Sequence, residues 1–322
     1  MKRFLLLPLL RRNPAEIARQ ARRFHIDTDE GHQLVSRLGA AFIAGYNTML
    51  TARGPREVKD EGMRVDPHFR PFFFEGAAMG YLPRGYLLRG FEVANAERDL
   101  MAMHPRFRYL YYVGLGFWYG FRHRRSPSRI AAIEPHVERL YYPLCYDGFG
   151  FKLGFFEYPQ RPAVRRVLDR GPAEHRSVLW QGFGRALFFV YMDDEKSFES
   201  EKAAARDEHR DDLEFGRSLA LAFTGLDRPE RIVTHLDAAR VGRDQAARLL
   251  GVTWALTARE MNDPDYFGEC VGRAPAETGK LLRRLPELCR GALDRSGSYA
   301  EWQRKTREAV LGAYPPPGEA RG

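Results

Sequence analysis

The stretch Leu179–Phe189, LWQGFGRALFF, decides how the rest of the chain is interpreted. Two glycines, Gly182 and Gly184, interrupt an apolar run that otherwise has the composition of a helix. Glycine inside a helix costs about 1 kcal/mol relative to alanine. A helix that keeps two glycines therefore needs a compensating reason, and the other parts of the chain supply one.

Six further blocks of the chain share this pattern. With the first stretch included, the blocks read, in order, RLGAAFIAGY, FEGAAMGYL, YVGLGFWYGF, YDGFGFKLGFF, WQGFGRALFF, EFGRSLALAF and LLGVTWALTA. Their leading glycines are Gly39, Gly76, Gly114, Gly148, Gly182, Gly216 and Gly251, separated by 37, 38, 34, 34, 34 and 35 residues. Two positions later each block has a small residue, namely Ala41, Ala78, Gly116, Gly150, Gly184, Ser218 or Thr253. A fixed period of this length is typical of repeat architectures.

Each block lies in a segment with helical periodicity. In the last one, apolar residues recur at helical spacing over 246–257, and Asn262 and Pro264 end the pattern. Shorter helical pieces lie between the blocks, and Pro127 and Pro229 are well placed in their first turns. Alternation typical of strands is almost absent. The sequence therefore predicts an all-α fold of about seven helical-hairpin repeats of 34–38 residues, in a compact curved or closed α/α array.

The glycines of several blocks come in pairs four residues apart. The pairs are Gly76 with Gly80, Gly116 with Gly120, and Gly150 with Gly154. Residues at this spacing share one face of a helix, so neighbouring helix axes can approach closely there. We expect this packing to offset the loss of helix propensity. The alternative is that the small residues line a channel and make room for a ligand.

The ends of the chain differ from the repeats. We expect an N-terminal extension over 1–28, one repeat domain over 29–314 and a disordered tail over 315–322. The apolar start MKRFLLLPLLRR is broken by Pro8 and lacks a small-residue cleavage site, so it does not have the pattern of a signal peptide. We expect Phe4–Leu10 to pack on the protein itself, with peripheral contact to a membrane as the alternative.

Composition excludes several classes of protein. The 322 residues include three widely spaced cysteines, which indicate neither disulfides nor a zinc site and favour a reducing, cytoplasmic setting. The net charge of +9 is spread along the chain without a nucleic-acid-binding motif, so we predict no nucleic-acid partner. A basic surface does suit an acidic partner protein such as an acyl carrier protein.

The residue before the leading glycine varies in an informative way. Glu75, Asp147 and Gln181 stand where other blocks have Leu38, Val113, Phe215 or Leu250. A carboxyl in apolar surroundings has a raised pKa and can act as a general acid, so Glu75 and Asp147 are the catalytic candidates. The alternative is that each carboxylate caps or pairs with a neighbouring helix.

Cations and aromatics near the blocks are candidates for contacts to a substrate. Cations within a turn of the glycines could pair with those carboxyls or bind an anionic ligand group, and aromatic side chains could line a cavity or simply form core. The predicted substrate-binding residues are Lys152, Gln181, Arg185, Arg217, Trp118, Tyr146, Trp180 and Trp254.

The acidic cluster Asp193, Asp194 and Glu195 follows the fifth block. It is similar to aspartate-rich magnesium sites, but its spacing matches them poorly and a helix-to-turn junction has the same composition. We therefore predict no metal and no cofactor, with Mg²⁺ at Asp193 and Asp194 as the alternative. The chain also lacks phosphate-loop, nucleophile-elbow and zinc-hydrolase motifs.

The blocks FEGAAMG, YDGFGFKLGFF and WQGFGRALFFV, in this order and spacing, resemble the UnbL-type family of unknown function from enediyne polyketide gene clusters and related loci. The similar part runs from about Leu34 to Arg290. The resemblance implies a role in maturing a polyene-derived natural product, beside neighbouring biosynthetic proteins, and it supplies no catalytic residues.

Two functions follow as expectations. In the first, an aromatic cavity holds a long hydrophobic polyene, enediyne-like or isoprenoid-like, and Asp147 or Glu75 triggers its cyclisation or rearrangement. The alternative is a non-catalytic helical scaffold that docks a carrier protein or partner enzymes.

Overall fold

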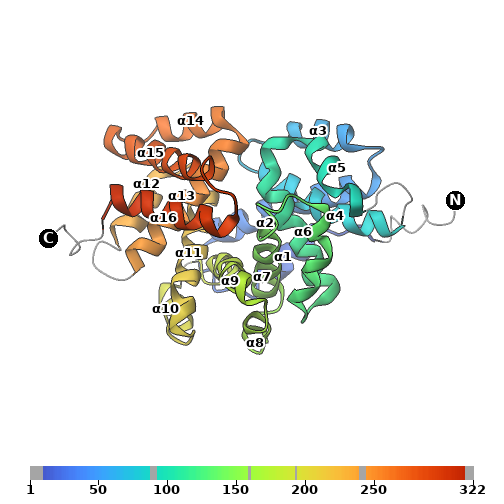
Figure 1. The fold of residues 1–322 in the computed structure, drawn as a ribbon, viewed down its shortest axis with the longest axis horizontal. Helices are drawn as coiled ribbons and strands as arrows, with labels where there is room; N and C mark the ends of the chain where they lie inside the picture. Colours follow the sequence, from blue (N-terminus) through green and yellow to red (C-terminus); the bar gives the residue numbers. More distant parts are fainter. Residues whose placement is uncertain (1–9, 88–92, 159–160, 193, 239–243, 316–322) are drawn as a thin grey trace.

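The computed structural model describes residues 10–87, 93–158, 161–192, 194–238 and 244–315. Long and short helices alternate along these residues, which contain no strand (Figure 1). The long helices are α2 (Asp29–Thr51), α4 (Arg70–Leu87), α6 (Arg108–His123), α7 (Leu144–Phe156), α9 (Arg176–Val190), α11 (Asp207–Thr224) and α13 (Asp244–Asn262). The short elements after them are α3 (Pro55–Arg64), α5 (Ala96–Met103), the 3-10 segment η4 (Pro127–His136), α8 (Val164–Asp169), α10 (Glu195–Ala203), α12 (Pro229–Asp237) and α14 (Pro264–Gly272). The predicted all-α repeat is confirmed.

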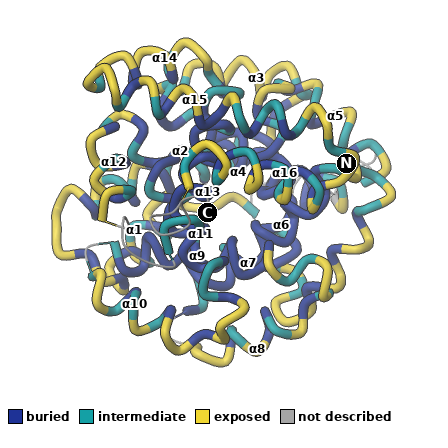
Figure 2. The backbone as a smooth tube through the Cα atoms, turned by 60° about the vertical axis from the view of Figure 1, so that its left-hand side comes forward, coloured by how far each residue is buried: buried dark blue, intermediate teal, exposed yellow. Residues whose placement is uncertain are grey.

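The long helices lie inside and the short elements outside. Figure 2 shows mostly buried backbone at the centre of the molecule and exposed backbone along its rim, where α3, α8, α10 and α14 lie. Pro127 and Pro229 each occupy the first turn of a short element, as expected, although the element that begins at Pro127 is a 3-10 segment with Pro135 inside it.

The block glycines lie where neighbouring long helices touch. A Cβ on Gly182 would lie 1.9 Å from the carbonyl oxygen of Asp147 on α7, and one on Gly184 would lie 2.4 Å from that of Leu213 on α11. The first glycine of the pair therefore packs against the preceding long helix and the second against the following one. This confirms the packing interpretation of the glycines.

Pairs of glycines four residues apart show the direction of the helices. On α6, Gly116 contacts Cys145 of α7 and Gly120 contacts Lys152 of α7. Later residues of one helix therefore contact later residues of the other. Helices α6 and α7 therefore run parallel. Because the intervening short element brings the chain back, each repeat can begin at the same end of the molecule as the last.

The first block needs a correction of register. Gly76 packs against the carbonyl of Phe42, as Gly114 packs against that of Glu75. Phe42, not Leu38, is therefore the equivalent of Glu75 in the first repeat. Gly39 lies one turn earlier and instead receives the side chain of Ile17 from the N-terminal segment.

The array closes into a ring. The guanidinium of Arg259 on α13 donates to the carbonyl of Phe223 on α11 at 2.7 Å and to that of His68, just before α4, at 3.0 Å. Arg70 on α4 forms an ion pair with Asp263 at 2.7 Å. These contacts join the start of α4, the second long helix, to the last long helix, α13, and so close the array into a ring.

The ends of the chain cap the two ends of this ring. Helix α1 (Ala15–Ala21) and the loop after it lie over the carboxyl ends of α7 and α9, where Gln20 donates to the carbonyl of Phe155 at 2.9 Å. At the other end, α15 (Ala276–Leu293) and α16 (Tyr299–Ala313) close the ring, and Trp302 of α16 packs against Trp254. The lumen, which is the space enclosed by the ring of long helices, is thereby covered at both ends.

Two of the sequence-based expectations concern segments at the ends of the chain. Most of Phe4–Leu10 and nearly all of the predicted tail lie outside the described residues, although Leu10 itself packs against the core. Among the helices described, none combines the length and the apolar character needed to cross a membrane.

Candidate functional site

Two adjoining cavities occupy the lumen of the ring. Each has a volume of about 70 Å³, which is room for several water molecules or part of a small ligand. The residues shared by both cavities are Phe72, Glu75, Arg185, Leu219 and Phe223. The aromatic walls of the first are completed by Phe42, Phe117, Phe151, Phe155, Phe156 and Phe189, and those of the second by Tyr109, Trp254 and Trp302. The polar groups therefore stand at the junction of two apolar chambers.

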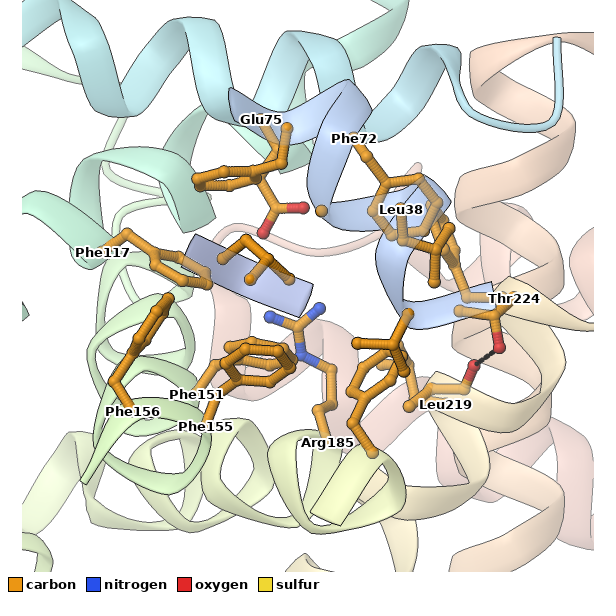
Figure 3. Close-up of a pocket in the computed structure, with 17 residues that line it drawn as sticks. Leu38, Phe72, Glu75, Phe117, Phe151, Phe155, Phe156, Arg185, Leu219 and Thr224 are labelled. Carbon is orange, nitrogen blue, oxygen red and sulfur yellow. Dashed lines mark hydrogen bonds between the residues drawn. The ribbon is translucent and has the colours of Figure 1, made fainter. Parts of the chain in front are cut away.

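Glu75 projects from α4 into this junction. Figure 3 shows its carboxylate facing the guanidinium of Arg185, which enters from the opposite side. Glu75 is 5 % exposed and has no hydrogen bond or ion pair among the described residues. Burial raises the pKa of its carboxyl to about 7, against a smaller lowering effect of Arg185 and a raising effect of Asp147. Glu75 is therefore a buried acid that changes charge near neutral pH.

Arg185 and Asp147 form an ion pair beside this acid. A guanidinium nitrogen of Arg185 lies 2.5 Å from a carboxylate oxygen of Asp147, and the guanidinium lies over the ring of Phe151 at 4.9 Å. Burial raises the pKa of Asp147, and Arg185 opposes this shift. Within the described part of the chain, the buried Nε of Arg185 has no hydrogen-bond acceptor. The pair thus retains an unused donor next to the lumen.

Tyr299 of α16 brings a hydroxyl close to the same cluster. Burial raises the pKa of this hydroxyl, and the nearby Asp147 raises it further. Tyr299 is 5 % exposed and its ring packs against Trp254. The cluster is therefore assembled from four helices that lie far apart in the sequence.

The repeat explains why the carboxyls reach the lumen. Gly114 and Gly182 of the next long helix pack closely against the backbone carbonyls of Glu75 and Asp147. With these backbones held at the helix interface, the side chains of Glu75 and Asp147 turn inward, as does Val113 at the equivalent position. The position before the glycine is therefore a lumen position in these three repeats.

Gln181 occupies the equivalent position in the next repeat but lies away from the lumen. Its amide nitrogen donates to Ser177 at 3.0 Å and to Asp212 at 3.2 Å, and its amide oxygen accepts from Gln303 of α16 at 3.2 Å. Gln181 therefore joins α9 to α11 and to α16. Of the two polar residues predicted on α9, Gln181 and Arg185, it is Arg185 that lines the lumen.

Two of the predicted cations are also outside the lumen. Lys152 pairs with Glu157 and lines a groove at the carboxyl ends of α6 and α7. Arg217 pairs with Glu195 and lies over the ring of Phe198 at 4.2 Å. Both cations form ion pairs, which is the first of the two roles expected for them, but their partners are Glu157 and Glu195 instead of the block carboxyls Glu75 and Asp147.

Of the four predicted aromatics, Trp254 lines the lumen and the other three pack elsewhere. Tyr146 shares a hydrogen bond with Tyr142 at 2.9 Å. Trp180 stacks on the ring of His209 at 4.7 Å, and Trp118 lies beside Tyr86. The neighbours named here are not among the residues that line the two lumen cavities.

Apart from Arg185, which was among the predicted cations, sequence reasoning missed a regular set of wall residues. Four positions after Val113, Asp147, Gln181 and Phe215 come Phe117, Phe151, Arg185 and Leu219, and all of these line the lumen. Residues four apart share a helix face, so extending each block by one turn would have predicted them. Tyr299 and Trp302 lie beyond the repeats, and nothing in the block pattern points to them.

The side chains of the acidic clusters that the structure describes are engaged by other protein groups. Asp194 accepts from the backbone N–H of Ser197 and so caps α10, while Asp193 lies outside the described residues. A second group, Glu199, Glu214 and Asp244, surrounds the ammonium of Lys202, which lies within 2.9 Å of all three carboxylates. Helix capping and a buried cation account for these carboxylates.

Comparison with known proteins places the chain in a family. Residues 2–266 match the family model described as "Protein of unknown function (DUF1702)". The chain belongs to this family. No curated protein and no solved structure matches the chain. For this member of DUF1702, function is therefore argued from the lumen and its charged cluster.

Proposed function

We propose that this DUF1702 protein binds a segment of a long hydrophobic polyene chain in its lumen and catalyses proton transfer on it, as a step of specialised-metabolite biosynthesis. The observation that supports this most strongly is Glu75, a buried carboxyl that faces an aromatic cavity and has no hydrogen-bond or ion-pair partner in the described part of the chain. Burying such a group opposes folding unless something compensates, so its presence favours a functional role.

The cluster suits a reaction that needs no cofactor. With a pKa of about 7, Glu75 can donate a proton near neutral pH and, once ionised, accept one. Protonation of one atom of the polyene and loss of a proton from another returns Glu75 to its acid form and leaves the composition of the ligand unchanged. An isomerisation or cyclisation has this balance, and the aromatic walls stabilise positive charge that develops on the chain.

Arg185 and Asp147 have a supporting role in this reaction. Each time Glu75 loses its proton, the guanidinium of Arg185 faces the new carboxylate. Asp147 holds that guanidinium in place through their ion pair. We propose that the pair limits the cost of ionising Glu75 in the lumen.

The test is complementation of a strain from which the gene has been deleted. Wild type and a control on the exposed face of α15, Glu287→Gln, are expected to restore the missing metabolite. Glu75→Gln keeps the shape of the side chain but cannot transfer the proton, so product should fall by about a hundredfold or more. Full restoration by a normally folded Glu75→Gln protein would contradict the catalytic proposal.

A scaffold that docks an acyl carrier protein or neighbouring biosynthetic enzymes is the second candidate, and the net charge of +9 favours it. It predicts that deletion removes the product while Glu75→Gln restores it. It also predicts that an acidic carrier protein is captured by the purified chain at low salt and released at high salt.

A further inference from the structure

A groove at the carboxyl ends of α6 and α7 adjoins the first lumen cavity. Its volume is about 400 Å³, and it shares the apolar residues Ile17, Phe42 and Phe156 with that cavity. Ile17 belongs to α1, the helix that covers this end of the lumen. The groove is therefore placed where a ligand in the lumen would reach the surface.

The groove is strongly basic. Five cationic side chains line it, namely Arg12, Arg23, Arg124, Lys152 and Arg161, and its two acidic side chains are Glu16 and Glu157. Both acids are already engaged, Glu16 with Arg12 at 3.5 Å and Glu157 with Lys152. Glu157 also pairs with Arg161, with 3.7 Å between a guanidinium nitrogen and a carboxylate oxygen.

Arg23 and Arg124 are the unsatisfied charges of the groove. Neither has an ion-pair partner among the described residues, and both are exposed. They come from separate segments, since Arg23 follows α1 and Arg124 follows α6. Two unpaired guanidinium groups in one cavity are a favourable place for an anion.

The lumen has the opposite character. Its one guanidinium, Arg185, is already paired with Asp147, and Glu75 adds a further acid. An anion is thus disfavoured inside, while an apolar chain is favoured there by the aromatic walls. The two cavities together discriminate between the two ends of an amphipathic molecule.

We propose that the groove binds the anionic head group, a carboxylate or phosphate, of an amphipathic ligand whose apolar chain passes Ile17, Phe42 and Phe156 into the lumen. Arg23 and Arg124 bind the head group. This inference rests on the proposed binding of a hydrophobic chain in the lumen and adds the orientation and chemical class of the ligand.

The experiment uses the full chain and parinaric acid, a conjugated polyene carboxylic acid that fluoresces in apolar surroundings, together with its neutral methyl ester. The groove variant is Arg23→Ala with Arg124→Ala. A matched control, Arg19→Ala with Arg125→Ala, removes the same charge from neighbouring exposed positions that do not line the groove. A lumen variant, Leu219→Trp, fills the junction of the two chambers.

The groove variant should bind the acid about tenfold more weakly than wild type and the ester with little change, and the control should resemble wild type. Dodecyl phosphate and dodecanoate then compete with the acid, and the stronger competitor identifies the head group. Leu219→Trp should weaken both acid and ester alike.

Two results separate the failure of this inference from failure of the proposed function. If Leu219→Trp weakens both ligands while the groove variant binds the acid as tightly as the matched control does, the lumen binds the chain and the head-group site is wrong. If neither ligand binds wild type, or a folded Leu219→Trp protein binds both as well as wild type does, the lumen is not the binding site and both proposals fail.

Discussion

At the scale of single residues, the site depends on an acid kept neutral by its surroundings. Glu75 has aromatic neighbours and no hydrogen-bond partner among the described residues, whereas Asp147 has Arg185 beside it. Two carboxyls in one lumen thus differ in environment, one unpaired and one paired. Such a difference is how a site assigns different protonation states to groups of the same type.

This difference predicts how stability depends on pH. The pKa of Glu75 is about 7 in the folded protein and near 4.5 in the unfolded chain. Between these values the unfolded chain releases the proton first, so the free energy of unfolding decreases as pH rises, by up to about 3 kcal/mol, and levels off above the folded pKa.

Glu75→Gln should remove this decrease in the free energy of unfolding, because glutamine does not titrate. Denaturant titrations should show the variant gaining up to about 3 kcal/mol relative to wild type between about pH 4.5 and about pH 8. Glu287→Gln on α15 is the control and should show no such trend. A difference between Glu75→Gln and wild type that does not change with pH would contradict the assignment.

The sequence revealed Glu75, Asp147 and Arg185 because they interrupt an apolar repeat. It could not separate them from Gln181. On α7 both Asp147 and Phe151 line the lumen, whereas on α9 Gln181 is held outside it by contacts to α11 and α16. Those contacts involve residues that the block pattern does not predict.

At the scale of elements, the glycines set the distance between the inner helices. On α9, Gly182 meets the backbone of α7 and Gly184 that of α11, so one helix packs closely on both sides. Backbone cannot move aside as the end of a flexible side chain can. The spacing of the blocks was sufficient to predict this role, because the repeat places a small residue at every equivalent contact.

Gly182→Ala should therefore destabilise the protein by about 3 kcal/mol, through overpacking against a backbone carbonyl. The matched control is Gly268→Ala in the exposed middle of α14, where an added Cβ meets nothing within 4 Å. That change should stabilise the protein by up to about 1 kcal/mol through helix propensity. Thermal and denaturant unfolding measure both, and equal effects of the two changes would contradict the role given to Gly182.

At the scale of the whole molecule, closure of the ring creates the lumen. Arg259 contacts the carbonyls of Phe223 and His68 and so ties the last repeat to an early one. Helices α1 and α16 then cover the two ends. The sequence left open and closed arrays undecided, because the seam depends on contacts between residues nearly two hundred positions apart that have no counterpart within the repeat.

Arg259→Met tests the contact that closes the ring, in which Arg259 binds the carbonyls of Phe223 and His68. The change keeps most of the side-chain volume but leaves two buried carbonyls without their donor, which should cost about 3 kcal/mol. Hydrogen exchange should accelerate first at the start of α4 and the end of α11. Arg273→Met, at the exposed residue directly after α14, is the control. Uniform acceleration of exchange across the chain in Arg259→Met would contradict a local contact between α13 and the start of α4.

The most direct measurement is the titration of Glu75 itself in the intact protein. Carbon-13 labelling of glutamate side chains, with Glu75→Gln to assign the signal, gives its pKa by NMR. The structure predicts a carboxyl that titrates near 7 and is absent from the variant. In Asp147→Asn that pKa should fall, because a repelling carboxylate is lost and Arg185 is released to face Glu75. A Glu75 carboxyl that titrates near 4.5, as in an unfolded chain, would contradict a buried neutral acid in the lumen.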